Sequence, residues 1–250
     1  MEWEKIYQDR SMSAREASRL IQNGDRVVIG HAAGVPLAIT DVMAEHKEDY
    51  RDVEIMQMVS MGNAKFAESG TEGHFHLNSM FLGAHSRQAV KEGRGDFTPC
   101  CFSEIPGLFR DYLPVDVAII IVTPPDKDGY CSCGISVDYT LPAARCAKRV
   151  IAQVNPRMPR THGDTFLHVS EIDAFGEIEE PVLELAIPKI GEVERAIGEN
   201  CAKLVRDGDT LQLGIGGIPD AVLLFQKGKK DLGIHSEMIS DGVVELIEAG

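Results

Sequence analysis

The sequence predicts an α/β protein built from two tandem copies of an open, mostly parallel sheet domain, the second copy being incomplete. Short runs rich in Val and Ile alternate with helical patterns along the chain, which is typical of parallel sheets covered by helices. A stretch around Gly24 recurs around Gly208, which indicates an internal duplication. Far less sequence follows the second copy of this stretch than the first.

The first copy begins with a helix and a strand that are both marked by local signals. Ser13 and Glu16 form the capping pattern Ser-x-x-Glu ahead of an apolar helical stripe, and Gly24 ends that helix. Residues 26–30 are then predicted as a buried strand, and residues 31–36 as a turn of small residues that leads into a helix. Strand, turn and helix in this order are the unit that parallel α/β sheets repeat.

Three further apolar runs are predicted as the remaining central strands of the first copy, at residues 53–59, 115–122 and 149–154. They are rich in β-branched residues and have the length of a strand rather than of a helix. Residues 123–141 and residues 155–165 contain many proline, glycine and polar residues. Both stretches are therefore predicted as long loops.

The internal repeat keeps a constant spacing along its whole length. Residues 19–30 align with residues 203–214 without a gap, so that Gly24 pairs with Gly208 and Asp25 pairs with Asp209. His31 begins the turn of the first copy at the place where the second copy has its glycine turn. We therefore expect His31 to border the cleft between the domains and to take part in a substrate pocket, the alternative being a structural or exposed histidine.

The repeat predicts two α/β domains, residues 1–188 and residues 189–250. The second domain would contain only the first strands of its sheet, which leaves strand edges and one sheet face uncovered. We expect either that the chain is truncated at its C-terminus, or that a complementing C-terminal half or a homo-oligomer completes the sheet. The alternative is that the last residues pack as an appendage on the first domain.

Composition and charge argue against several classes of partner. The sequence has 25 Lys and Arg against 39 Asp and Glu, a formal net charge of −14, which disfavours nucleic acid and anionic membranes. No apolar run reaches the roughly 18 residues of a membrane span, and residues 1–5 do not resemble a signal peptide. The six cysteines show neither a disulfide framework nor a zinc pattern. We expect a cytoplasmic protein without a metal.

The candidate site lies in the second copy, in two neighbouring stretches. An apolar strand runs into the glycine turn of residues 214–217 and then into a helix, an arrangement in which backbone N–H groups can bind an anion. This turn lacks the glycine spacing of a dinucleotide fingerprint, so nicotinamide binding is only a distant alternative. Residues 232–242 are predicted as a second strand with Glu237 in its middle, where the first copy has Met58. Because burying a charge is costly, Glu237 is either a nucleophile or a hydrogen-bonded structural acid.

Residues 214–222 and residues 235–242 resemble the acetyl-CoA hydrolase/transferase group of family I CoA-transferases. Shorter motifs at residues 124–126, 134–140 and 163–173 agree, so the resemblance covers the whole chain. It implies a CoA-transferase that uses CoA as a substrate and has no permanently bound cofactor. The implied partners are a short-chain carboxylate and an acyl-CoA whose acyl group is 4-hydroxybutyryl, butyryl or acetyl. Family members extend well past residue 250, which agrees with an incomplete second copy.

The resemblance also implies roles for individual residues. Glu237 occupies the position of the family's nucleophile, which forms an acyl anhydride and then a glutamyl-CoA thioester. The residues implied to contact CoA are Gln212, Leu213, Gly214, Ile215, Gly216 and Gly217. For Gln212 the alternative is a structural amide in the core.

Two other functions remain open at this point. An acyl-CoA hydrolase, in which water takes the glutamyl thioester, could use the same scaffold. A catalytically inactive CoA-binding or assembly module would require a partner chain that supplies the rest of the fold. Detecting a separate reading frame for the remaining α/β half would favour the module, whereas the transferase and the hydrolase differ in the fate of the thioester.

Overall fold

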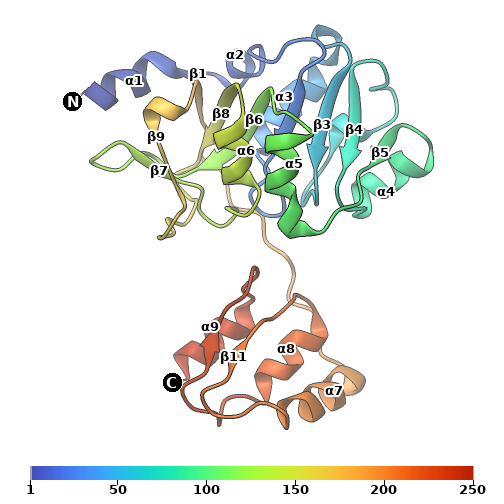
Figure 1. Cartoon of the computed structure of the whole chain (residues 1–250), viewed down its shortest axis with the longest axis vertical. Coiled ribbons are helices and arrows are strands. Elements are labelled where there is room, and N and C mark those ends of the chain that lie inside the picture. The colour runs from blue at the N-terminus through green and yellow to red at the C-terminus, as the bar shows by residue number, and fades with distance from the viewer. Residues whose placement is uncertain (1, 250) are drawn as a thin grey trace. The chain divides into compact units, whose positions relative to one another are not determined.

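The computed structural model, which describes residues 2–249, divides the chain into two compact units, Met1–Glu184 and Leu185–Gly250 (Figure 1). The domain boundary expected from the repeat lay after residue 188. Both positions fall within residues 178–191, a stretch that contains neither helix nor strand. Each unit has its own sheet and its own buried apolar side chains.

Among the described residues, the first unit contains an eight-stranded parallel sheet with the order β1-β10-β8-β6-β2-β3-β4-β5. Its strands are β1 (Ser11–Met12), β2 (Arg26–Ile29), β3 (Val53–Gln57), β4 (Phe75–Ser79), β5 (Gly95–Phe97), β6 (Val117–Val122), β8 (Arg149–Val154) and β10 (Ala174–Glu177). The chain moves outward from β2 to β5 and then returns to the other side of β2 with β6. Open α/β sheets bind ligands at the carboxyl ends of the strands beside such a reversal.

The sheet of the first unit is covered on both faces (Figure 1). Its helices are α1 (Glu2–Arg10), α2 (Ala14–Ser18), α3 (Leu37–Glu45), α4 (Ala84–Lys91), α5 (Ile105–Asp111) and α6 (Thr140–Cys146). On β6, Ala118 and Ile120 pack in the apolar cluster that includes α5 and α6. Val117 and Ile119 pack in the opposite cluster with α2, α3 and α4. A strand buried on both faces needs a continuous apolar run, which is why the sequence of β6 does not alternate.

The two predicted loops have different outcomes. Residues 155–165 contain no helix or strand, as predicted. The prediction for residues 123–141 was wrong, because this stretch contains β7 (Tyr130–Ser132), which pairs antiparallel with β9 (Phe166–His168), and the start of α6. The N–H of Thr123 donates to the carbonyl oxygen of Ser132 at 2.9 Å, so the proline- and glycine-rich segment folds back on itself. A strand of three residues is too short to show a periodicity.

Two cysteines of this folded-back segment yield a testable prediction. Cys131 and Cys133 are fully buried, and burial raises the pKa of each thiol to about 12. Because the thiolate is the nucleophile, both side chains stay protonated and unreactive at pH 8. We expect iodoacetamide to modify the exposed Cys101 of the native chain and to spare Cys131 and Cys133, as followed by peptide mass spectrometry. Rapid labelling of either buried thiol before unfolding would contradict this packing.

The second unit is smaller and combines helices with a two-stranded parallel sheet. Its elements are α7 (Glu192–Ala202), β11 (Thr210–Leu211), α8 (Gly217–Leu224), β12 (Gly233–Ile234) and α9 (Asp241–Glu248). Leu213, Leu223 and Val243 form its buried apolar cluster. Large apolar side chains stay exposed on α9, where Val244 is 49% and Ile247 is 69% exposed. Within residues 2–249, the outer edges of β11 and β12 are unpaired and α9 exposes apolar side chains, as expected for the second copy.

The turn before the first strand of the repeat has the same structure in both units. In the first unit, the N–H of Gln22 donates to Oδ2 of Asp25 at 2.8 Å. In the second unit, the N–H of Arg206 donates to Oδ2 of Asp209 at 2.7 Å. The two donors occupy equivalent positions in the sequence repeat, and so do the two acceptors. The duplication predicted from the sequence is therefore visible in the hydrogen bonding.

Strand pairing fixes how the second strands of the two units correspond. β2 pairs with β3, and β11 pairs with β12, both in parallel. Gly233 lies opposite Thr210, and Glu54 lies opposite Arg26, which is the equivalent of Thr210 in the repeat. Gly233 therefore corresponds to Glu54. Four residues further along each of the two segments, Met58 corresponds to Glu237. The structure thus supports the correspondence that was expected from the sequence.

Candidate active site

A glycine turn joins β11 to α8 in the second unit. Gly216, the N-cap of α8, has a φ of 116° and a ψ of 178°, a conformation that side chains rarely adopt. The helix then begins at Gly217, so the first N–H groups of α8 have no partners within the helix. A Cβ at Gly214 would meet nothing closer than Pro219, at 4.0 Å. The turn therefore offers open backbone next to a helix N-terminus, which is a suitable place for an anion.

The residues predicted to contact CoA differ in their exposure. Gln212 follows the end of β11 and is exposed, which excludes the alternative of a core amide. Leu213 is only 8% exposed and packs in the apolar cluster of the second unit, so its side chain faces the core. Gly214 and Ile215 are exposed, and the remaining two glycines of the turn are half-buried. Apart from Leu213, these residues are accessible to a ligand through backbone or side chain.

Glu237 does not lie in the middle of a strand, and this part of the prediction was wrong. β12 ends at Ile234, and Glu237 follows in an exposed bend before α9. The backbone ladder stops where the N–H of His235 donates to the carbonyl oxygen of Leu211 at 3.0 Å. The apolar residues around Glu237 continue the pattern of a strand without pairing to one. Because its carboxylate is exposed, the argument from a costly buried charge does not apply here.

One side chain joins the glycine turn to the segment that carries Glu237. The hydroxyl of Ser236 donates to the carbonyl oxygen of Leu213 at 2.8 Å and accepts from the N–H of Leu213 at 3.2 Å. The residue before the glycine turn is thereby bonded to the residue before Glu237. Both stretches lie at the carboxyl ends of two parallel strands, where ligands bind in open α/β sheets. Sequence reasoning missed Ser236, because a serine beside a carboxylate has no distinctive pattern.

In the first unit, His31 follows β2 at the point where the strand order reverses. The side chain is 9% exposed, its Nε2 lies 2.8 Å from Oδ2 of Asp138, and its ring stacks on Tyr139 with centroids 4.6 Å apart. Its Nδ1 is buried and has no hydrogen-bond partner among the described residues. Burial also raises the pKa of Tyr139, whose hydroxyl donates to the carbonyl oxygen of Ile29 at 2.8 Å. His31 is therefore a buried, hydrogen-bonded histidine rather than an exposed one.

Metal-binding clusters and membrane spans are other features that could define a site. No group of three or more His, Cys, Asp or Glu side chains within residues 2–249 is placed to hold a metal ion. None of the helices in the same range is long and apolar enough to cross a membrane. In the second unit, the hydrogen bonds of Ser236 join the segment that carries the exposed Glu237 to the residue before the glycine turn.

The first unit is an open, parallel α/β sheet whose strand order reverses at β2, and comparison with known proteins gives the family. The model of the acetyl-CoA hydrolase/transferase N-terminal domain matches residues 1–185, so the chain belongs to this family. The chain is 56% identical over 251 residues to 4-hydroxybutyrate coenzyme A transferase of Clostridium kluyveri. It is 42% identical over 248 residues to succinyl-CoA:cyclohexane-1-carboxylate CoA transferase of Geobacter metallireducens. These matches cover 100% and 99% of this chain but only 58% and 56% of the relatives.

Solved structures agree with this assignment. RipA from Yersinia pestis matches with a TM-score of 0.95 and 29% identity, covering 100% of this chain and 61% of that chain. A 4-hydroxybutyrate CoA-transferase from Porphyromonas gingivalis matches with a TM-score of 0.84 and 40% identity, covering 99% of this chain and 59% of that chain. The fold is therefore that of CoA-transferase structures, and the chain spans well under two thirds of the proteins it matches.

Proposed function

We propose that this chain carries the nucleophile and the coenzyme loop of a CoA-transferase, which moves CoA between a short-chain acyl-CoA and a carboxylate. The observation that supports the proposal most is the contact between Leu213 and Ser236, which joins the residue before the glycine turn to the residue before the exposed Glu237. The names of the relatives support the same reaction class. Because the relative with 56% identity is a 4-hydroxybutyrate coenzyme A transferase, 4-hydroxybutyryl-CoA is the acyl donor of first choice.

In the proposed reaction, a carboxylate oxygen of Glu237 attacks the thioester carbonyl of the acyl-CoA. The C–S bond breaks, the CoA thiolate leaves, and an acyl anhydride joins the acyl group to Glu237. The thiolate then attacks the Cδ carbon of Glu237, which releases the acyl group as a free carboxylate and leaves a glutamyl-CoA thioester. The incoming carboxylate takes the same path in reverse. Covalent steps of this kind replace one difficult exchange with several easier ones.

The glycine turn and the N-terminus of α8 supply the electrostatic part of the mechanism. The net charge of −14 repels CoA, which is itself an anion, so binding requires a local site that favours negative charge. Backbone N–H groups at a helix N-terminus provide such a site, and donors aimed at a developing oxyanion lower the barrier to attack. We propose that CoA binds there as a substrate and that the protein has no permanently bound cofactor. His31 is proposed as part of a substrate pocket, since its Nδ1 is buried and has no hydrogen-bond partner among the described residues.

The sheet of the second unit also implies a partner. By correspondence with the first unit, β11 takes the place of β2, which has β6 as its second neighbour. No strand of the described residues pairs with the outer edges of β11 and β12, and α9 exposes apolar side chains. We propose that a further polypeptide segment or another copy of the chain supplies the missing neighbours. The six free thiols are compatible with the reducing cytoplasm as the location of the complex.

An exchange assay tests the proposed function and separates it from its alternatives. The chain is incubated with butyryl-CoA or 4-hydroxybutyryl-CoA and deuterated acetate, alone and with the unmatched part of the Clostridium kluyveri relative added as a second polypeptide. We expect deuterated acetyl-CoA and the free acid of the donor in the presence of this complementing polypeptide. Free CoA as the main product would replace the transferase with a hydrolase. CoA binding without either product would leave an inactive binding module.

A further inference from the structure

We propose that Ser236 is a positioning residue that holds Glu237 in place against the glycine turn. This inference deepens the proposed function and rests on it, because it takes Glu237 as the nucleophile. Ser236 itself need not touch the reacting atoms. Where β11 and β12 end, the hydroxyl of Ser236 makes the hydrogen bonds to Leu213 that a paired strand would otherwise make.

The backbone hydrogen bonds between the two strands of the second unit end before Leu213 and Ser236. The N–H of His235 donates to the carbonyl oxygen of Leu211 at 3.0 Å, which is the last of these backbone bonds in the described residues. Both backbone groups of Leu213 instead bond to the hydroxyl of Ser236. This hydroxyl accepts from the N–H of Leu213 at 3.2 Å and donates to its carbonyl oxygen at 2.8 Å. A serine hydroxyl can do both, since it has one donor and two acceptor lone pairs. It therefore satisfies a residue that is only 8% exposed.

This contact controls the position of the nucleophile. The side chain of Leu213 is anchored in the apolar cluster of the second unit, so its backbone is the fixed partner. The peptide that links Ser236 to Glu237 is the partner that would move, because it lies beyond β12 in an exposed bend. Within residues 2–249, no other side chain joins residues 235–239 to residues 212–217 through a hydrogen bond. The hydroxyl of Ser236 thus provides the side-chain hydrogen bonds that join residues 235–239 to residues 212–217 among the described residues.

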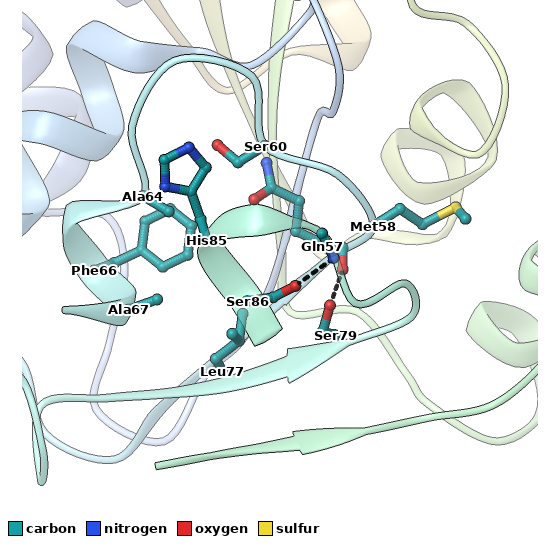
Figure 2. A pocket seen from close by; sticks show the side chains of 11 residues that line it. Gln57, Met58, Ser60, Ala64, Phe66, Ala67, Leu77, Ser79, His85 and Ser86 are labelled. Carbon is teal, nitrogen blue, oxygen red and sulfur yellow. Dashed lines mark hydrogen bonds between the residues drawn. The ribbon is translucent and has the colours of Figure 1, made fainter. Parts of the chain in front are cut away.

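In the first unit, the residue that corresponds to Ser236 makes a similar contact, one position further along the first strand. Gln57 corresponds to Ser236 when the second strands are aligned by their pairing. Its Nε2 donates at 2.9 Å to the carbonyl oxygen of Gly30, which corresponds to Gly214 in the sequence repeat. Figure 2 shows Gln57 at the end of β3, near Ser79, where both line a cavity of about 10 Å³. In both units, a polar side chain at the end of the second strand therefore bonds to the backbone at the end of the first strand.

The two units differ in the residue that comes after this side chain. In the first unit the next residue is Met58, which has no charge to direct. In the second unit the next residue is Glu237, so the same tie acts on the carboxylate. Serine is also much shorter than glutamine, and it makes its contact only if the two strand ends lie close together. In the second unit, the short side chain of Ser236 therefore makes this contact directly next to the carboxylate-bearing residue Glu237.

Removing the hydroxyl by Ser236→Ala leaves the N–H and the carbonyl group of Leu213 without their partner and frees the bend that carries Glu237. A displacement of ~1 Å costs an oriented reaction about a hundredfold in rate. We expect Ser236→Ala to slow formation of the CoA adduct on Glu237 by about 10- to 100-fold, with little change in the KM for acyl-CoA. Ser236→Thr keeps a hydroxyl at the same atom and should restore most of the rate.

The test follows the CoA adduct over time by intact-mass spectrometry, on the full chain treated with butyryl-CoA in the presence of the complementing polypeptide. Ser240→Ala is the matched control, because the hydroxyl of Ser240 bonds to Oδ1 of Asp220 at 2.8 Å and does not contact Leu213. A purely structural effect would reduce the final extent of labelling and leave the rate constant of the folded fraction unchanged. A slower rate in Ser236→Ala, restored in Ser236→Thr and unchanged in Ser240→Ala, supports positioning by Ser236.

Two further outcomes separate this inference from the proposed function. If the unmodified chain forms the adduct and Ser236→Ala forms it at the same rate, Ser236 does not position the nucleophile, although Glu237 keeps its role. If Ser236→Thr is as slow as Ser236→Ala, the hydroxyl is not the group that matters, and the inference is again wrong. If the unmodified chain forms no adduct on Glu237, the proposed function fails and this inference fails with it.

Discussion

Replacing Glu237 by glutamine is expected to abolish the CoA adduct and to reduce acyl transfer far below the rate of the unmodified chain. Glutamine keeps the size of the side chain but has no charged oxygen that can attack the thioester carbonyl, so the anhydride cannot form. Glu237→Asp keeps the charge and withdraws it by one methylene, which should cost on the order of a hundredfold. Both variants are measured by initial rates of acyl exchange with the complementing polypeptide present.

A loss of stability should not explain these effects. Glu237 is exposed, so its substitution should leave the thermal unfolding midpoint almost unchanged. Glu248→Gln, which removes an equally exposed carboxylate from α9, is the matched control and should keep full activity. Transfer by Glu237→Gln close to that of the unmodified chain, in freshly prepared protein checked for deamidation, would place the nucleophile at another residue.

Replacing Gly198 by leucine is expected to unfold the second unit and to leave the first unit folded. A Cβ at this position would lie 2.6 Å from the backbone carbon and oxygen of Ala221, and backbone cannot move aside as a flexible side chain can. The helix α7 would have to separate from α8, because Gly198 packs directly against the backbone of Ala221 in α8. Overpacking costs about 1–3 kcal/mol even in larger cores, and a small unit has little stability in reserve.

Hydrogen exchange with mass spectrometry measures this effect unit by unit. In Gly198→Leu we expect protection to be lost in α7, α8 and the strands of the second unit, whereas β6 of the first unit stays protected. Gly228→Ala is the control, since a Cβ there meets no atom within 4 Å and its φ is not in the left-handed range. Unchanged protection of α7 and α8 in Gly198→Leu would contradict their close packing. Gly198→Leu should also lose the CoA adduct on Glu237, because the second unit that contains Glu237 no longer folds.

The fold could be predicted where local signals agree with the final packing. The capping pattern at Ser13 is formed as predicted, since its N–H donates to the carboxylate of Glu16 at 2.9 Å. The strand β8 matches its predicted bounds at Arg149–Val154, because the apolar run at residues 150–152 is buried and strands of a covered parallel sheet are rich in such residues. The duplication was visible because the Gly-Asp pair of the turn before the first strand recurs at a constant spacing, and its aspartate makes the same hydrogen bond in both copies.

Other features depend on neighbours that sequence patterns do not specify. Glu237 was expected inside a strand because apolar residues flank it, but a strand ends where pairing ends, and β12 has only two residues. The partners of His31 were not predicted, since Asp138 is distant in the sequence and meets it only through the return of the chain across the sheet. Ser236 was overlooked for a similar reason. Its importance derives from the backbone groups of Leu213 that it satisfies, and a sequence does not show which groups lack partners.

The most direct test of the central claim is to locate the covalent intermediate. The chain with its complementing polypeptide is treated with acyl-CoA, reduced with borohydride, digested and mapped by mass spectrometry. A glutamyl thioester is reduced to an alcohol at Cδ, so we expect one modified peptide, the one that contains Glu237, and only when acyl-CoA and borohydride are both added. Acyl transfer that proceeds without this modification, or with the modification at a different acidic residue, would contradict the assignment of Glu237 as the nucleophile.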